Sequence, residues 1–196
     1  MTSSKTKAKL VDVARQLFAK TGLENTTMND IALASGKGRR TLYTYFKSKE
    51  EIYLAVIESE LDILSDVQQK VAEKKISPEQ KLMEMIYAHL DAVKEVVFRN
   101  GTLRADFFRD IWQVETVRKR VDAKERLLIR DILAEGVEKG VFDVDDIYMT
   151  AEIVHYSVKG IETPYIRGQI GAHLKDSEKE EYVSKLVLRA LGKQFQ

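Results

Sequence analysis

Apolar residues recur at intervals of three and four along most of this chain, which is the spacing of one face of an α-helix. Within residues 5–21, for example, Leu10, Ala14 and Phe18 fall on one face. No stretch shows the strict alternation of a strand, and the chain contains only two prolines. The pattern predicts an all-α protein with long helices over residues 5–21, 48–74, 77–99, 114–139, 146–165 and 178–192. It also predicts a short helix over residues 102–112, with a break near Gln113.

Residues that cap helices stand where several of these segments begin. Thr27 is followed three positions later by Asp30, and Ser48 is followed in the same way by Glu51. Each pair fits a capping box, in which a hydroxyl and a carboxylate satisfy free backbone amides at a helix start. Pro78 follows a serine and suits the first turn of the next helix. These caps fix the starts of three helices.

Residues 26–49 predict two short helices separated by a turn at Gly36. Small apolar side chains of the first helix, Ile31, Ala32 and Ala34, allow the second helix to cross closely. The second helix is expected from about Arg39 to Phe46, and Leu42 and Phe46 share its buried face. In such a helix-turn-helix the second helix lies in the DNA major groove. Its other face is cationic and rich in hydrogen-bond donors: Arg39, Arg40, Thr41, Tyr43, Thr44 and Tyr45.

Charge is divided unevenly along the chain, although the net charge is only +1. Residues 1–49 contain ten Lys or Arg and three Asp or Glu, a balance of +7, and the remaining residues contain 22 and 28, a balance of −6. A basic N-terminal part on an acidic remainder favours phosphate binding by the N-terminal part alone. The charge pattern therefore agrees with a nucleic-acid partner for the helix-turn-helix.

Five short motifs in this region resemble the tetracycline-repressor (TetR) family of bacterial transcription regulators. They are Phe18-Ala19, Lys20-Thr21-Gly22, the run from Thr26 to Ala32, the run from Thr41 to Phe46, and Lys47-Ser48-Lys49-Glu50-Glu51. The resemblance covers roughly residues 8–57. Lys37-Gly38 departs from it, because the family usually has a small apolar residue and then Ser or Thr there. Gly38 removes a side-chain cap from the second helix, and Lys37 adds a charge beside the DNA.

The resemblance implies a helix-turn-helix DNA-binding domain over residues 1–48 and a helical ligand-binding and dimerisation domain over residues 49–196. It implies a ligand-responsive regulator, most simply a repressor, that binds a pseudo-palindromic operator as a homodimer. In the family, the last two helices form a four-helix bundle with their twin. Packing of these two helices within one monomer remains the alternative. Another function class stays open, a helical interaction module that binds protein or non-specific nucleic acid.

The recognition helix divides its contacts between bases and phosphates. Arg39 or Arg40 can reach guanine O6 and N7 together, and Thr41 or Thr44 can touch a thymine methyl group. Phosphate contacts position a protein without reading the sequence. We assign these to five other side chains: Thr26, Thr27, Tyr43, Tyr45 and Lys49.

Aromatic and polar residues farther along the chain are candidates for an effector pocket, because such pockets are mostly apolar with a few aimed polar atoms. Aromatic residues at helical spacing are more often core, so this alternative is the stronger one. The histidines show no His-x-x-x-His spacing, and no metal or other cofactor is expected. The candidate pocket residues are Tyr87, His89, Phe107, Phe108, Trp112 and Tyr156.

Other classes of protein lack support in the sequence. There is no cysteine, which excludes disulfides and thiol catalysis. No apolar run approaches the ~18 residues needed to span a bilayer, and the N-terminus lacks the apolar core of a signal peptide. A cytoplasmic protein without a membrane partner is expected. No Gly-rich phosphate loop or nucleophile arrangement argues for an enzyme.

Overall fold

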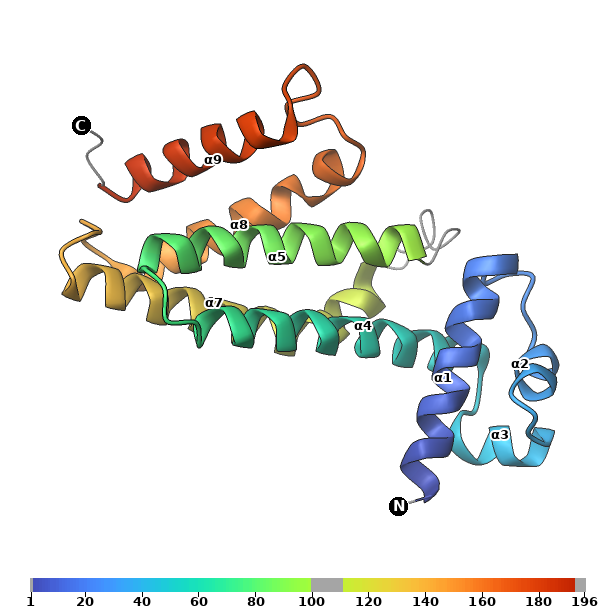
Figure 1. The fold of residues 1–196 in the computed structure, drawn as a ribbon. Helices are drawn as coiled ribbons and strands as arrows, with labels where there is room; N and C mark the ends of the chain where they lie inside the picture. Colours follow the sequence, from blue (N-terminus) through green and yellow to red (C-terminus); the bar gives the residue numbers. More distant parts are fainter. Residues whose placement is uncertain (1, 100–110, 193–196) are drawn as a thin grey trace. The chain divides into compact units, whose positions relative to one another are not determined.

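The computed structural model describes residues 2–99 and 111–192, and within these residues every regular element is an α-helix (Figure 1). The chain divides into two compact units: residues 1–63 with 95–119, and residues 64–94 with 120–196. Besides residues 95–99 and 111–119, which belong to two later helices, the first unit, called the head below, contains three helices and the first part of a fourth. They are α1 (Thr2–Thr21), α2 (Met28–Ala34), α3 (Arg39–Tyr45) and α4 (Lys49–Ala72).

The head has a core built from the apolar faces that the sequence predicts. Phe18 of α1, Ile31 of α2 and Leu42 of α3 are fully buried, and Phe46 directly after α3 is nearly so. Ile52 of α4 is also fully buried. Ala34 is an exception, because it is exposed instead of lying on the buried face of α2. The core holds α3 through its Leu42 face, which leaves the opposite face of this short helix uncovered.

Local capping explains where the helices of the head begin. The Thr27 side chain accepts a hydrogen bond from the Asp30 amide, and the Asp30 carboxylate accepts one from the Thr27 amide, which confirms the predicted capping box. Ser48 accepts a hydrogen bond from the Glu51 amide at the start of α4. Gly38 precedes α3 in an extended conformation without a side-chain cap, as its lack of a side chain dictates.

The second unit, called the body below, is a bundle of long helices around one core. Leu82 and Met85 of α5, Ile129 and Leu133 of α7, and Val158 of α8 are among its buried residues. α4 passes from the head into the body between residues 63 and 64, and α5 and α7 likewise contribute residues to both units. The remaining helices are α5 (Pro78–Arg99), α7 (Ile111–Glu138), α8 (Ile147–Ile166) and α9 (Asp176–Ala190).

Several boundaries differ from the sequence-based predictions: α1 begins at Thr2 instead of residue 5, and α9 covers Asp176–Ala190 instead of residues 178–192. α7 runs through Gln113 without interruption, so the predicted break is wrong. α4 ends at Ala72, slightly before the expected end. Most of the predicted short helix over residues 102–112 lies outside the described residues. Capping residues marked three of the predicted helix starts, whereas the break near Gln113 was only weakly indicated by the sequence.

A glycine inside α7 allows the end of this helix to pack closely. A Cβ atom at Gly136 would lie 2.0 Å from the Cδ2 atom of Phe142. The Phe142 ring is buried in the core of the body and therefore occupies the space that a larger residue at 136 would need.

Among the described helices, none is both long and apolar enough to cross a bilayer.

Candidate nucleic-acid interface and the polar core of the body

The uncovered face of α3 presents a dense set of donors and cations. Arg39, Arg40, Thr41 and Thr44 are exposed, and the Tyr43 side chain is 52% exposed. Neither arginine makes an ion pair within the described part of the chain. The two guanidinium groups are therefore free to form bidentate hydrogen bonds with an external acceptor.

The threonines of this face keep their methyl groups available. The Thr44 hydroxyl donates a hydrogen bond to the Arg40 carbonyl at 2.9 Å, which is a common arrangement inside helices. This contact uses the donor of Thr44 and fixes the direction of its side chain. Tyr45 is half-buried and Lys37 is partly exposed. The structure thus places Lys37 and the predicted α3 side chains on or beside one helix.

Thr26 and Thr27 have different environments, although they are neighbours in sequence. The Thr26 side chain is 2% exposed, and its hydroxyl donates to the Gly22 carbonyl at 2.7 Å and pairs with the Thr21 hydroxyl at 2.9 Å. This burial corrects the prediction that the Thr26 side chain contacts a phosphate, because it instead fastens the loop between α1 and α2. Thr27 is exposed at the start of α2. Hydrogen bonds from the Thr27 hydroxyl and amide hold the pKa of Asp30 below its usual value.

The Lys49 side chain has a structural contact that the sequence did not indicate. Its ammonium group donates to the Leu23 carbonyl at 2.7 Å and lies 3.4 Å from the Glu24 carbonyl. Lys49 therefore ties the start of α4 to the loop after α1. An ammonium group has three protons, so these two contacts leave one for a phosphate oxygen.

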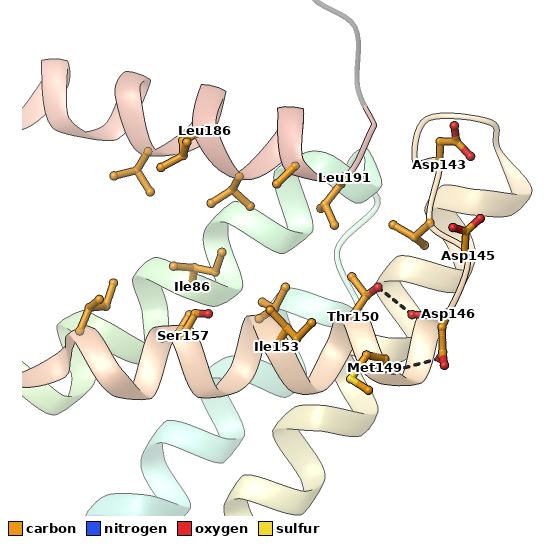
Figure 2. A pocket seen from close by; sticks show the side chains of 17 residues that line it. Ile86, Asp143, Asp145, Asp146, Met149, Thr150, Ile153, Ser157, Leu186 and Leu191 are labelled. Atoms are coloured by element: carbon orange, nitrogen blue, oxygen red, sulfur yellow. Dashed lines mark hydrogen bonds between the residues drawn. The ribbon is translucent and has the colours of Figure 1, made fainter.

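The body contains an apolar groove of about 560 Å³ lined by residues of α5, α8 and α9 and of the segment before α8. Figure 2 shows Ile86, Ile153 and Leu186 along the groove and acidic side chains of the segment before α8 at one end. Asp146 of this segment caps α8 by accepting a hydrogen bond from the Met149 amide at 3.0 Å. The Leu186 side chain is 60% exposed and Ile153 is 58% exposed, so the walls of the groove are open to solvent.

Of the residues predicted to form an effector pocket, the three with described side chains, Tyr87, His89 and Tyr156, do not line this groove. Tyr156 is 57% exposed, and its ring packs edge-on against His155. The buried Tyr87 hydroxyl has no hydrogen-bond partner among the described residues, and burial raises the pKa of Tyr87 to about 12. Phe107 and Phe108 lie outside the described residues, as does the side chain of Trp112, which belongs to the first turn of α7.

His89, the remaining candidate, lies at the centre of a buried polar network instead of facing an open cavity. Its Nδ1 atom is 2.7 Å from Glu125 Oε1 and its Nε2 atom is 2.8 Å from Glu162 Oε1. The other Glu125 oxygen, Oε2, is 2.8 Å from His155 Nδ1. Gln68 also donates to Glu125 Oε1. All five side chains are buried, so this network joins α4, α5, α7 and α8 within the body.

The charges of this network support one another. Burial alone lowers the pKa of His89, but its hydrogen bonds to Glu125 and Glu162 and their negative charges outweigh burial and raise the pKa to about 9. Burial alone raises the pKa of Glu125, but hydrogen bonds from His155 and His89 and their charges lower it to about 2. At neutral pH the interior therefore holds a His89 imidazolium ion that is hydrogen-bonded to the ionised Glu125 and to Glu162.

Sequence reasoning missed this network because its members are far apart along the chain. One signal was present. Glu125 falls one helical turn from both Val121 and Ile129, and Glu162 falls one turn from both Val158 and Ile166. A carboxylate on the apolar face of an amphipathic helix is a candidate for a buried, paired group.

Comparisons with known proteins agree with the geometry of the head. Residues 10–56 match the model of the bacterial regulatory proteins of the tetR family. The chain is 33% identical over 148 residues to the HTH-type transcriptional repressor KstR2 of Mycolicibacterium smegmatis, covering 71% of this chain and 70% of that protein. It is 24% identical over 190 residues to the HTH-type transcriptional regulator QacR of Staphylococcus aureus, covering 95% and 98%.

The fold extends this likeness over nearly the whole chain. A transcriptional regulator from Cytophaga hutchinsonii has a TM-score of 0.73 and 23% identity, and the match covers 93% of this chain and 96% of that chain. Together with the KstR2 match, the helix-turn-helix identifies the class of protein. The chain belongs to the tetR family of bacterial regulatory proteins, which are non-enzymatic, ligand-responsive transcription regulators that bind DNA.

Proposed function

We propose that this protein is a repressor that binds a pseudo-palindromic operator as a homodimer and releases it when an effector binds the body. The observation that carries the proposal is the exposed face of α3, on which Arg39 and Arg40 have no ion pair within the described residues. A surface helix with free guanidinium groups suits the major groove, where guanine offers two acceptors side by side. Because the DNA of a bacterium is cytoplasmic, the proposal also places the protein there.

Individual side chains of the head have separate roles in this proposal. Arg39 and Arg40 read guanine, and the methyl groups of Thr41 and Thr44 contact thymine. Phosphate contacts fall to the remaining candidates, which fix the register of the helix. These are Thr27, Lys37, Tyr43, Tyr45 and Lys49.

The dimer in this proposal forms through α8 and α9. Apolar side chains that are more than half exposed are concentrated there, including Tyr148, Ile153, Tyr182 and Leu186. Exposed apolar side chains gathered on one surface mark an interaction site. A second copy placing its own α8 and α9 against this surface covers them and part of the apolar groove. Each half-site then meets one head, with half-sites about 34–36 Å apart.

Regulation requires that the effector distinguish two states of the dimer. An effector shifts an equilibrium only by its differential affinity for the two states. We place the effector site in the body and assign transmission to α4, which contributes residues to both units.

Selection of bound duplexes from a random DNA pool at about physiological salt tests operator binding. The expected result is an enriched inverted repeat bound at least ~10³-fold more tightly than random DNA. Arg167→Ala, an exposed arginine of the body, is the matched control for Arg40→Ala and should leave the selected motif unchanged. Binding that disappears with salt and enriches no motif would establish only a basic, non-specific head.

A separate experiment tests the dimer. Leu186→Asp puts a charge into the proposed interface, so sedimentation should show a folded monomer with weakened operator binding. Leu127→Asp is the control, because Leu127 is 48% exposed on α7, away from the proposed interface. If Leu186→Asp remained a dimer, α8 and α9 would not form the interface.

A further inference from the structure

Two adjacent helices of the body bring three metal-binding side chain types to one buried place. Asp122 and Glu125 lie one turn apart on α7, and His155 lies on α8. One potential ligand atom from each of these residues lies within 4.8 Å of the other two. Their exposed fractions are 7%, 3% and 0%. None of these residues lies among the proposed DNA contacts, the exposed apolar side chains of α8 and α9 or the lining of the apolar groove.

The histidine of this cluster has an unsatisfied nitrogen. His155 Nδ1 is 2.8 Å from Glu125 Oε2, whereas the buried Nε2 atom has no hydrogen-bond partner in the described part of the chain. Buried polar atoms are nearly always paired, so an orphan in the interior calls for an explanation. A neutral imidazole can carry its proton on either nitrogen. Before a metal ion binds, Nδ1 donates its proton to Glu125 Oε2, and a metal ion that takes the Nδ1 lone pair requires the ring proton to move to Nε2.

Neighbouring residues hold Glu125 in the orientation that a ligand needs. His89 and Gln68 both bond to its Oε1 atom, which leaves Oε2 directed at His155. Metal-binding carboxylates and histidines are typically fixed in this way by hydrogen bonds from surrounding groups. The arrangement therefore includes both candidate ligands and the residues that orient them.

A cation already occupies the remaining side of the cluster. The Lys159 ammonium group is 2.7 Å from Asp122 Oδ2, and its side chain is 17% exposed. Lys159 thus reaches the surface, and a rotation of its side chain into water would open a path to Asp122. A metal ion entering along this path replaces one cation with another, so Asp122 does not become an uncompensated buried charge.

We propose that Asp122, Glu125 and His155 bind a divalent first-row transition-metal ion such as Zn²⁺. One imidazole nitrogen with two carboxylate oxygens suits Zn²⁺ and its neighbours in the series better than the all-oxygen sites that Mg²⁺ and Ca²⁺ prefer. Three protein ligands leave a fourth position for water or a small molecule. The site is independent of the proposed DNA contacts, so metal binding is measured without DNA.

Titration of the chelator-treated full-length protein with Co²⁺ provides the first test. We expect one Co²⁺ per chain with visible ligand-field absorption, displacement by Zn²⁺, and a rise in melting temperature on addition of either ion. Asp122→Asn and His155→Gln should each weaken binding by at least tenfold. His173→Gln, which removes an exposed histidine outside the cluster, should bind as the unaltered protein does.

Lys159→Met separates a metal site from a purely structural network. Without the competing ammonium group, Co²⁺ affinity should rise about tenfold or more, whereas a structural role for Lys159 predicts only lower stability. The proposal is overturned if the unaltered protein binds no Co²⁺ or Zn²⁺, if His155→Gln binds them equally well, or if His173→Gln abolishes binding. Circular dichroism of each metal-free variant identifies any variant that fails to fold. If a ligand variant does not fold, the Co²⁺ affinity of Lys159→Met decides between a metal site and a purely structural network.

Discussion

The exposed face of α3 and the interior of the body handle charge in opposite ways. On α3, Arg39 and Arg40 are exposed to water and make no ion pair within the described residues. In the body, His89, Glu125 and Glu162 are buried and bonded to one another. An exposed charge costs little and remains available to an external partner, whereas a buried charge must be paired. The head is therefore organised for a polyanion, and the body holds its charges for internal contacts or a small ligand.

Removal of the central cation of the body should have the largest effect. His89→Leu leaves Glu125 and Glu162 buried beside each other without the imidazolium ion that joins them. Breaking a buried pair in this way costs ~3–5 kcal/mol of unfolding free energy. Urea denaturation followed by circular dichroism measures it, and the exposed His173→Leu is the matched control.

A second substitution sharpens this prediction. Adding Glu162→Leu to His89→Leu removes one of the stranded carboxylates, so part of the lost stability should return. If both variants were as stable as the unaltered protein, the network would contribute nothing to the fold. The buried charges of the body would then contribute no more to the free energy of unfolding than the exposed charges of α3.

The pH dependence of stability should report the same network. The folded-state pKa of His89 is raised to about 9, above its ordinary value of 6.5. Its contribution is therefore fully present below about pH 6.5 and is lost as the pH rises through about 9. We expect the urea midpoint, measured with a chelator present, to fall over this range. The His89→Leu variant should lack this decline, and an equal decline in both proteins would show that another group causes it.

The head was largely predictable because its signals are local. The Thr27–Asp30 capping box and the pairing of Leu42 with Phe46 each involve residues three or four positions apart. Helical geometry converts such spacings directly into contacts. The structural role of Thr26 escaped prediction, because its burial depends on how the loop after α1 folds back on itself.

The polar core of the body could not be predicted from local spacing. Its hydrogen bonds join residues 30, 36 and 73 positions apart. Separations of this kind become contacts only when the packing of α5, α7 and α8 is known. His89 was consequently interpreted as a polar group of an effector pocket, although both of its ring nitrogens are bonded inside the core. The dimer contacts and the effector remain predictions for the same reason, since they depend on a second molecule.

On the surface side of the comparison, Arg40→Ala should affect binding without affecting folding. Loss of one bidentate contact to guanine costs ~1–3 kcal/mol of operator affinity and relaxes the choice of base at one position. Fluorescence anisotropy with the selected operator and its single-base variants measures both effects. The melting temperature should stay the same because Arg40 has no ion pair to lose within the described residues. A large fall in melting temperature would contradict the separation between surface and interior charges.

Lys37→Ala should have a smaller and less specific effect. If its ammonium group contacts a phosphate, removal weakens all duplexes about equally and reduces the slope of log affinity against log salt by about 1. Operator and random DNA measured at several salt concentrations distinguish this outcome from base reading. Preferential loss of operator binding would instead give Lys37 a role in specificity. Lys70→Ala, an exposed lysine in the last turn of α4, serves as the control.

The smallest effect is expected at Gly38, where α3 begins without a side-chain cap. Its φ of −68° suits any residue, and a Cβ atom there meets nothing within 4 Å. Gly38→Ser should supply a hydroxyl for a free amide of the first turn and raise stability by a few tenths of a kcal/mol, whereas Gly38→Ala should lower it. Thermal melts of the three proteins then give the order Ser, Gly, Ala. If the substitutions acted only by restricting the unfolded chain, the Gly38→Ala protein would be at least as stable as the Gly38→Ser protein. Both substitutions remove the conformational freedom of glycine from the unfolded chain. That order would show that the hydroxyl caps nothing, and that the start of α3 is held by the burial of Leu42 and Phe46 alone.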